Sequence, residues 1–315
     1  MTEDLTARKP EWLAIMIGYF LIYVVWGSTY YFIGVALEGF PPFLLGGLRF
    51  TTAGILLLSY SRIRGENVFK GGLIRKSAIS GIILLFIDMS VIMLAQKYLS
   101  SSLVAIIASS TVIWIMALDI PMWKTNFKIP AVSLGIVTGF LGVVLLFIEQ
   151  LFYTEENIHA EYGVALLVLG CISWALGTLY AKYKSSSEEK VNEFAGAAWQ
   201  MLLAGGMFWL CSFAICEGNT VRWEAISSSA WLSLVYLILF GSVLAYTSYI
   251  WLLKVRPATE VGTHAYVNPL VAVVLGTLLG AETISWIQMT GLCIVLLSIF
   301  LIRRPSARKS GKAIP

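Results

Sequence analysis

The chain has few charged residues. Asp, Glu, Lys and Arg make up 13% of its 315 residues, whereas 58% are hydrophobic. Soluble globular domains carry about 25% charged residues, so the composition argues against a water-soluble protein. The apolar runs are continuous over about 20 residues rather than alternating over about ten, which selects helices over barrel strands. We therefore predict an all-α integral membrane protein.

The motifs of enzymes and ATP-driven pumps are also missing. His159 and His264 are the only histidines, too few for an HExxH motif or a multi-histidine metal site. The sequence contains neither a GxSxG nor a Walker motif. The four cysteines form no CxxC pair and fall in apolar runs or at their ends, so we interpret them as buried small hydrophobic residues. We predict no enzymatic activity, no metal site and no cofactor.

Ten apolar segments of membrane-spanning length follow one another along the chain. The connections between them are too short to hold a soluble domain, so the function must reside within the membrane. The segments lie near 12–35, 41–60, 77–97, 100–122, 130–149, 161–182, 194–216, 230–253, 258–280 and 284–302.

The positions of the basic residues predict which side faces the cytoplasm. With the N-terminus inside, the outer loops hold only Lys97 and Arg222 of the 22 Lys and Arg residues, and Arg49 lies within a span. Both tails are basic, as an even number of spans requires. We predict that both termini are cytoplasmic, in a multi-pass protein of a bacterial inner (plasma) membrane. The basic tail at 304–315 then orients the protein and needs no nucleic-acid partner.

The two halves of the chain resemble each other weakly. "YVVWGSTYYF" in the first span and "CISWALGTLYAKY" in the sixth align Trp26 with Trp174, and the fourth and fifth spans resemble the ninth and tenth. Because each half has five spans, the second half would be inverted relative to the first, an arrangement that encloses a central cavity. We therefore expect two inverted-topology repeats of five helices, at 12–149 and 160–303.

Several motifs resemble the EamA family of the drug/metabolite transporter superfamily. They are "WGST", "LRFTTAGILLL" and the stretch "NPLVAVVLGTLLGAETISWIQMTGLCIVLLSIFLI", in which Pro269, Gly280, Glu282 and Gly291 stand at the family's spacing. In the first half Thr111 stands where the family usually has Pro. The resemblance implies a ten-helix transporter of small metabolites, amino acids or related compounds, often an exporter.

Polar and aromatic residues at membrane depth are candidates for the wall of a transport cavity. In one interpretation, "WGSTYY" supplies small residues that let helices approach closely. In the other, Trp26, Thr29 and Tyr30 line a central cavity, and Gly27 lets the helix flex. Further candidates for the cavity wall are Ser109, Ser110, Thr111, Trp114, Trp174, Tyr246 and Tyr249.

Two opposite charges lie near the middle of adjacent spans, Arg49 in the second and Asp88 in the third. An unpaired charge at this depth costs several kcal/mol, so we predict that they form a buried ion pair. The alternative is functional: Asp88 takes and releases a proton, or it meets a cationic substrate.

The ninth span carries a polar stripe. Glu260, His264 and Asn268 are spaced four residues apart and share one helical face, and Pro269 interrupts the helix directly after them. His264 is the second candidate for proton coupling, with a packing role as the alternative. Asn268 is a further cavity candidate. Glu282 lies at the outer end of the span, where we interpret it as an anchor or gate.

Together these features predict a secondary transporter of a small metabolite, such as an amino acid or an aromatic compound, by alternating access. The resemblance to the EamA family implies that it works as an exporter. A lipid flippase and an uptake permease of the same fold remain alternatives, while the inverted repeat argues against a channel. The expected partners are the small-molecule substrate, the lipid bilayer and protons as the coupling ion. We expect no nucleic acid and no obligate protein partner.

Overall fold

The computed structural model describes residues 12–95, 104, 107–152, 160–185, 193–280 and 285–302. These residues form helices joined by short turns, and no strand occurs among them. Five of these helices are long and apolar enough to cross a membrane, and three shorter apolar helices accompany them. The predicted all-α membrane class is confirmed for this part of the chain. Lys97, Glu282 and the tail at 304–315 lie outside the described residues.

Helical elements follow one another along both halves of the chain. In the first half they are α1 (Trp12–Phe20), η1 (Leu21–Val25), α2 (Trp26–Leu37), α3 (Pro42–Ile63), α4 (Gly71–Gly81), η2 (Ile82–Ile87), α5 (Asp88–Ala95), α7 (Thr111–Leu118), η3 (Ile120–Met122), α8 (Trp123–Asn126) and α9 (Pro130–Phe152). In the second half they are α10 (Ala160–Tyr180), η4 (Ala181–Ser185), α11 (Glu193–Ala214), η5 (Glu217–Thr220), η6 (Trp223–Ala225), α12 (Ser228–Tyr236), η7 (Leu237–Tyr246), α13 (Thr247–Val255), α14 (Ala258–Gly262), α15 (His264–Gly280) and α16 (Trp286–Ile302).

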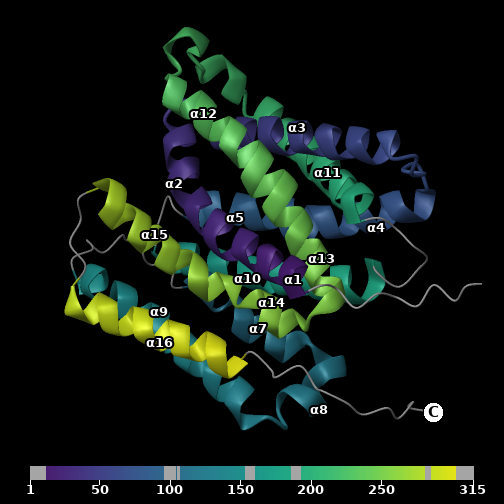
Figure 1. Cartoon of the computed structure of the whole chain (residues 1–315). Helices are drawn as coiled ribbons and strands as arrows, with labels where there is room; N and C mark the ends of the chain where they lie inside the picture. The colour runs from purple at the N-terminus through teal and green to yellow at the C-terminus, as the bar shows by residue number, and fades with distance from the viewer. Residues whose placement is uncertain are drawn as a thin grey trace, which may run out of the picture.

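Helices from the two halves of the chain lie side by side. α3 packs along α11, α9 packs along α16, and α15 packs on α2 between these two pairs (Figure 1). The main core cluster lies among the helices around α2 and includes Trp26, Phe50 and Phe208. A smaller cluster, with Ile136 and Tyr266 at its centre, joins α7, α9, α15 and α16. The core therefore depends on contacts between segments far apart in sequence.

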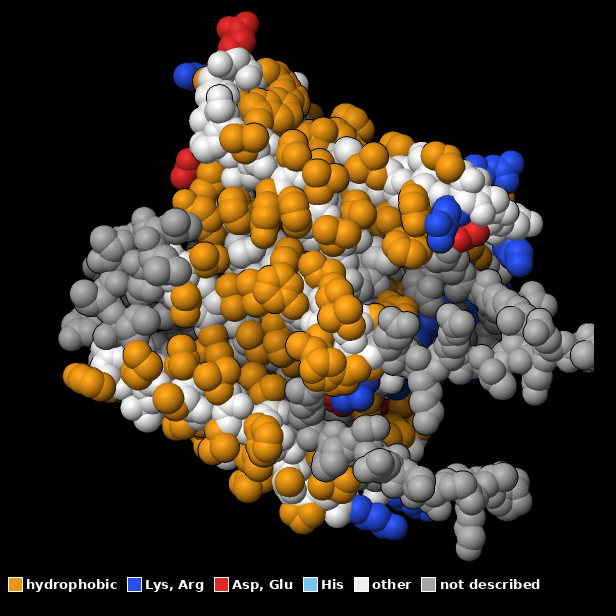
Figure 2. Space-filling view, viewed as in Figure 1, with side chains coloured by type: hydrophobic (Ala, Val, Ile, Leu, Met, Phe, Trp, Pro, Cys, Tyr) orange, Lys and Arg blue, Asp and Glu red, His pale blue; other side chains and the backbone are white. Residues whose placement is uncertain are grey.

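The outside of the helix bundle is hydrophobic. Figure 2 shows apolar side chains across the whole visible face, whereas most charged side chains lie near its edges. Exposed apolar residues occur along α1, α9, α11 and α16, among them Leu13, Leu134, Phe213 and Phe300. Such an apolar surface is unfavourable in water and favourable in the hydrocarbon of a bilayer. The helices suit that environment because they hydrogen-bond their own backbone groups.

The cysteines are not uniformly buried, which corrects our interpretation of the sequence. Cys171 is buried and Cys211 is partly buried, but Cys216 and Cys293 are exposed. Cys293 lies on α16, whose outer face carries other exposed apolar side chains such as Phe300. A small hydrophobic side chain on such a face can contact lipid and needs no place in the core.

The N-terminus of α3 is capped by a residue from the other half of the chain. The Glu217 carboxylate accepts hydrogen bonds from the backbone N–H groups of Leu44 at 2.7 Å and Phe43 at 3.3 Å. Pro42 stands at the first helical position, where its missing N–H costs nothing. A carboxylate at a helix N-terminus is favoured by the helix dipole. This contact fixes the start of α3 beside the segment that follows α11.

α3 and α11 approach each other closely at Gly205. A Cβ at this position would lie 2.6 Å from the Thr51 side-chain oxygen and 2.8 Å from its backbone nitrogen. At the next residue, Gly206, a Cβ would meet open space. Because Gly205 has no side chain, the backbones of α3 and α11 can pack in contact at this position.

This difference gives a matched pair of variants. We expect Gly205→Ala to destabilise the protein by about 1–3 kcal/mol, because the added methyl group overpacks the α3–α11 contact. Gly206→Ala should leave stability unchanged or raise it slightly, because Ala favours the helix by about 1 kcal/mol over Gly. Thermal unfolding of the purified proteins in detergent measures both. Equal melting temperatures for the two variants would contradict the close approach.

Candidate functional site

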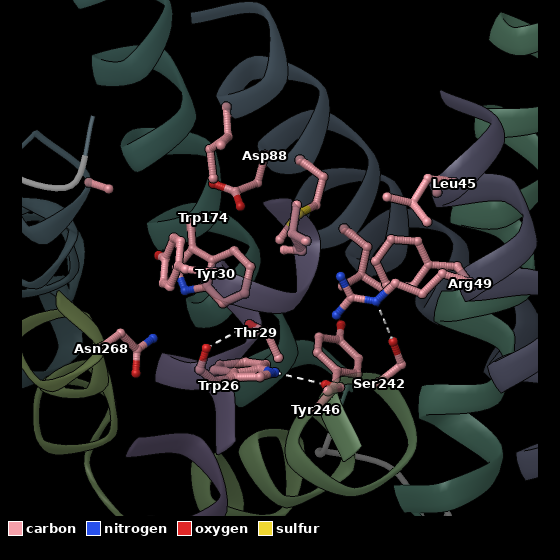
Figure 3. A pocket seen from close by; sticks show the side chains of 18 of the residues that line it. Trp26, Thr29, Tyr30, Leu45, Arg49, Asp88, Trp174, Ser242, Tyr246 and Asn268 are labelled. Carbon is pink, nitrogen blue, oxygen red and sulfur yellow. Dashed lines mark hydrogen bonds between the residues drawn. The ribbon is translucent and has the colours of Figure 1, made fainter. Parts of the chain in front are cut away.

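A cavity of about 340 Å³ lies within the helix bundle, bordered by α2, α3, α5, η7 and α15 (Figure 3). It begins at Trp26 and follows α2 to its last residue, Leu37, which makes it about 16 Å long. Apolar side chains such as Leu85 and Phe208 form most of the wall. The volume and the mostly apolar lining suit a small organic solute.

The structure brings most of the predicted cavity residues together around this space, and it leaves four of them elsewhere. Ser109 and Tyr249 are completely buried behind the wall, and Tyr249 is hydrogen-bonded to Thr178 at 2.5 Å. Ser110 does not line the cavity, and Trp114 packs against the core instead. The predicted residues that do line it are Trp26, Thr29, Tyr30, Asp88, Thr111, Trp174, Tyr246, His264 and Asn268. Pro269 also lines it, but the helix break predicted there is wrong, because α15 continues through Pro269 to Gly280 and the interruption lies at Thr263.

The predicted ion pair between Arg49 and Asp88 is not formed. Both side chains line the cavity, but the Arg49 Nε–H donates to the Ser242 hydroxyl at 2.8 Å and the guanidinium lies over the Phe50 ring. The carboxyl group of Asp88 makes no hydrogen bond or ion pair with any residue that the structure describes. The predicted pair fails although the two residues lie in adjacent spans at similar depth, because the Arg49 side chain points toward η7, a segment of the other half.

Two π-helical segments, η2 and η7, contribute residues to the cavity wall, and a third, η1, directly precedes the lining residue Trp26. A π turn shifts carbonyl oxygens out of the regular α-helical ladder and is frequent at functional sites. In η7 the Gly241 carbonyl accepts a hydrogen bond from the Trp26 indole at 2.8 Å. In η2 the Ile83 carbonyl accepts one from Ser173 at 3.1 Å. Side chains of other helices therefore hold these irregular turns.

Asn268 plays the same part for η1. Three backbone carbonyl oxygens surround one end of its amide, so that end is the NH2 group. It donates to Ile22 at 3.0 Å and to Tyr23 at 3.2 Å in η1, and to His264 one turn earlier on its own helix at 3.1 Å. Asn268 thus lines the cavity and also joins α15 to the first membrane helix by hydrogen bonds.

His264 lies among aromatic rings at the closed end of the cavity. The ring centroids of Trp26, Tyr249 and Trp174 lie 5.1, 5.4 and 6.1 Å from its own. Its Nδ1–H donates to the Val261 carbonyl at 3.0 Å. Trp26 and Trp174 contact each other edge to face, with centroids 5.9 Å apart. These rings separate the cavity from the helix ends beyond.

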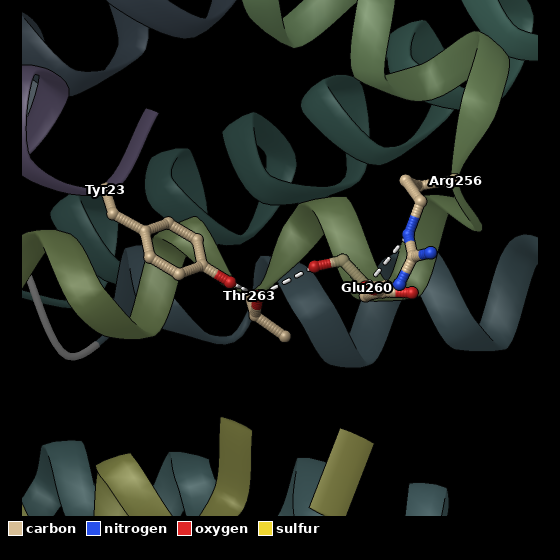
Figure 4. Close-up of polar contacts among 4 residues, drawn as sticks. All are labelled: Tyr23, Arg256, Glu260 and Thr263. Atoms are coloured by element: carbon tan, nitrogen blue, oxygen red, sulfur yellow. Dashed lines mark hydrogen bonds and ion pairs between the residues drawn. The ribbon is translucent and has the colours of Figure 1, made fainter. Parts of the chain in front are cut away.

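Beyond the rings, polar contacts join the ends of helices from both halves, and we name them the closing layer. Tyr23 is hydrogen-bonded to Thr263 at 2.6 Å, and Arg256 forms an ion pair with Glu260 (Figure 4). The closing layer further includes the hydrogen bond from Tyr183 to Asp119 and those from Lys182 to the carbonyls of Leu253 and Arg256. The cavity is therefore sealed at this end, while its lining continues to Leu37 and Pro42 at the other.

Sequence reasoning missed Ser242 and Gln200. Ser242 holds Arg49, and Gln200 accepts a hydrogen bond from Tyr246 at 2.7 Å while donating to Ser80 at 2.9 Å. Each is a lone polar residue within an apolar run, "LFGSVLAY" and "AAWQMLLA". A lone polar residue at membrane depth was the available signal, since it requires a partner on another helix.

A model of the EamA-like transporter family matches residues 13–148 and 161–304. This chain belongs to that family. The "Uncharacterized inner membrane transporter YedA" of Escherichia coli (strain K12) is 32% identical over 94% of this chain and 92% of its own. The "Probable amino-acid metabolite efflux pump" of Salmonella typhimurium is 25% identical over 97% of this chain and 100% of its own. The EamA-like protein described here is thus a membrane transporter and not an enzyme.

A solved crystal structure also resembles this EamA-like transporter. It covers 92% of this chain and 96% of its own with a TM-score of 0.75. The two sequences are 18% identical, so the likeness concerns the fold alone.

The role of Asn268 can be tested by two substitutions. Asn268→Ala removes the donor to Ile22 and Tyr23 and should lower stability by about 1–2 kcal/mol. Asn268→Asp places an oxygen against those carbonyls and should lower it at least as much, although the two side chains have the same shape. Thermal unfolding in detergent measures both. Wild-type stability of the Asp variant would show that the amide does not hold η1.

Proposed function

We propose that this protein is a secondary transporter that exports a small metabolite, an amino acid or an aromatic compound, from the cytoplasm. The observation that carries the proposal is the cavity between the two halves of the chain, sealed at one end and lined by Trp26, Tyr30 and Trp174. Aromatic walls with a few polar groups suit a solute that is part apolar and part polar. A relative named as a probable amino-acid metabolite efflux pump supports the same choice.

We further propose ten membrane-spanning helices in two inverted repeats, 12–149 and 160–303, with both termini in the cytoplasm. The family model matches the chain twice, over 13–148 and 161–304, which supports two equivalent halves. The pairing of Trp26 with Trp174 across the cavity supports a symmetric arrangement. Five spans in each half would invert the second half relative to the first.

In this orientation the closing layer lies on the cytoplasmic side, and the cavity extends toward the outside. This arrangement corresponds to the outward-open state of an alternating-access cycle. Opening to the cytoplasm would require the Tyr23–Thr263 and Arg256–Glu260 contacts to separate or move together with one half. Contacts at the Leu37 and Pro42 end would have to form in their place.

Export and the role of the cavity can be tested together. Cells that overproduce the protein should release at least one amino acid or aromatic metabolite into the medium in excess of empty-vector cells. Tyr30→Leu should reduce that excess, because it removes a ring of the wall, whereas Tyr31→Leu should preserve it. The two tyrosines are neighbours with similar exposure, 41% and 45%, and only Tyr30 lines the cavity. Untargeted metabolite analysis of the medium, at matched membrane levels, measures the effect.

Two results would contradict this proposal. Uptake into right-side-out vesicles without any release from cells would indicate an uptake permease. Movement of a lipid reporter between leaflets without any change in soluble metabolites would indicate a flippase.

We propose that transport is coupled to protons through Asp88. A carboxyl group with no partner among the described residues, facing a cavity that opens to water, can exchange a proton when access changes sides. The charged and titratable groups that share the cavity with Asp88 are Arg49, Tyr30, Tyr246 and His264. His264 is the weaker candidate, because it is held among aromatic rings with Nδ1 bonded to a carbonyl.

Asp88→Asn tests this coupling, because it keeps the shape and removes the titrating group. In inside-out vesicles with an acidic interior, the wild type should accumulate the exported solute. The variant should lose that accumulation, yet still exchange labelled for unlabelled solute at saturating concentration. Glu161→Gln, an exposed carboxylate at the start of α10, is the control and should behave as wild type. Full accumulation by Asp88→Asn would refute the proton role of Asp88.

A further inference from the structure

The cavity is lined by one basic and one acidic side chain that form no ion pair with each other. Arg49 on α3 and Asp88 on α5 both face the space in Figure 3, and no ion pair joins them. Arg49 is 6% exposed and Asp88 is 8% exposed. Removing either charge from water without a partner costs several kcal/mol. Arg49 therefore has no anionic partner among the described residues, and Asp88, when it is ionised, has no cationic partner among them.

The Arg49 guanidinium is fixed in place with most of its donors free. Its Nε–H donates to Ser242, and its carbon lies 4.9 Å from the centroid of the Phe50 ring. Neither terminal nitrogen donates to an acceptor within the described chain. Gly241 makes room for the group, because a Cβ there would lie 3.1 Å from Nη2. A planar guanidinium held in this way matches a carboxylate with two parallel hydrogen bonds.

Asp88 provides the opposite charge at another wall of the cavity. It is the first residue of α5, directly after the π-helical segment η2. Figure 3 shows its carboxyl group near Tyr30 and Trp174. Electron-rich ring faces beside a carboxylate form a favourable environment for an ammonium group. A cation at this point would have both the charge of Asp88 and the rings as partners.

We propose that the cavity binds a dipolar solute, with its carboxylate on the terminal nitrogens of Arg49 and its ammonium group on Asp88. Trp26, Tyr30 and Trp174 would contact the apolar part. This inference rests on the proposed function and narrows its substrate class to zwitterionic amino acids. A solute with only one of the two charges leaves the other side chain buried without a partner, and it binds more weakly for that reason.

Three solutes with the same aromatic body test the two charges separately. They are L-phenylalanine, phenethylamine, which lacks the carboxylate, and 3-phenylpropanoate, which lacks the ammonium group. Binding to the full-length protein in lipid nanodiscs is measured by calorimetry. We expect the wild type to bind phenylalanine about tenfold or more tightly than either analogue. Each analogue lacks one charged group and therefore loses one charge-assisted hydrogen-bonded contact.

Variants that remove one charge then identify which side chain binds the carboxylate of the solute and which binds its ammonium group. Arg49→Gln should bind phenylalanine and phenethylamine with similar affinity, because the carboxylate has lost its partner. Asp88→Asn should bind phenylalanine and 3-phenylpropanoate with similar affinity. Arg49→Lys and Asp88→Glu keep the charges and should retain part of the preference for phenylalanine. The controls are Arg62→Gln, at the exposed end of α3, and Glu161→Gln, and both should match the wild type.

The wild-type comparison needs no variant, so it remains decisive even where a substitution prevents folding. Equal affinity of the wild type for the three solutes would overturn the proposal, as would a variant that weakens all three by the same factor. Binding of none of them would overturn the zwitterionic site as well. Export itself is judged independently by the metabolite comparison, so a failure of the dipolar site and a failure of the proposed function are distinguishable.

Discussion

The packing of the interior depends on side chains that hydrogen-bond the backbone carbonyl oxygens of π-helical turns within the membrane. Hydrocarbon offers no hydrogen bonds, so a polar backbone group at that depth must find its partner in the protein. Gly241 in η7 is bonded by Trp26, Ile83 in η2 by Ser173, and Ile22 in η1 by Asn268. Each bond joins two different helices. Two of these irregular turns, η2 and η7, carry residues of the cavity wall, so the wall is joined to neighbouring helices at these points.

This arrangement explains why polar residues cluster around an otherwise apolar space. Trp26 bonds a carbonyl through its indole nitrogen while its ring contacts Trp174, Tyr249 and His264. Arg49 is oriented by Ser242 and leaves its terminal nitrogens for the cavity. The same side chains therefore stabilise the bundle and form the surface that a solute would meet. A substitution there affects packing and recognition together, which is why neighbouring or isosteric control variants are needed.

The sequence predicted the class of the protein and much of its cavity for clear physical reasons. Membrane segments are recognised by composition, because charged residues are excluded from lipid. Trp26, Thr29, Tyr30 and Asp88 stood out as polar or aromatic residues at membrane depth, and all four line the cavity. Tyr249 and Trp114 carried the same signal and lie behind the wall, because residue type does not reveal which side of a helix faces an internal space.

Only the tertiary structure decided the partner of Arg49. The sequence placed it and Asp88 in adjacent spans, and a pair at similar depth was the expected result. In the folded chain Arg49 contacts η7, 193 residues away in sequence, and Asp88 remains apart. Composition determined the helical membrane class, and the motifs that resemble the EamA family indicated the transporter family that the family model matches. Helix packing across the two halves decides which charged side chains meet. Hydrogen bonds between distant segments depend on how each helix is rotated about its axis and on its depth in the membrane, and the sequence pattern encodes neither.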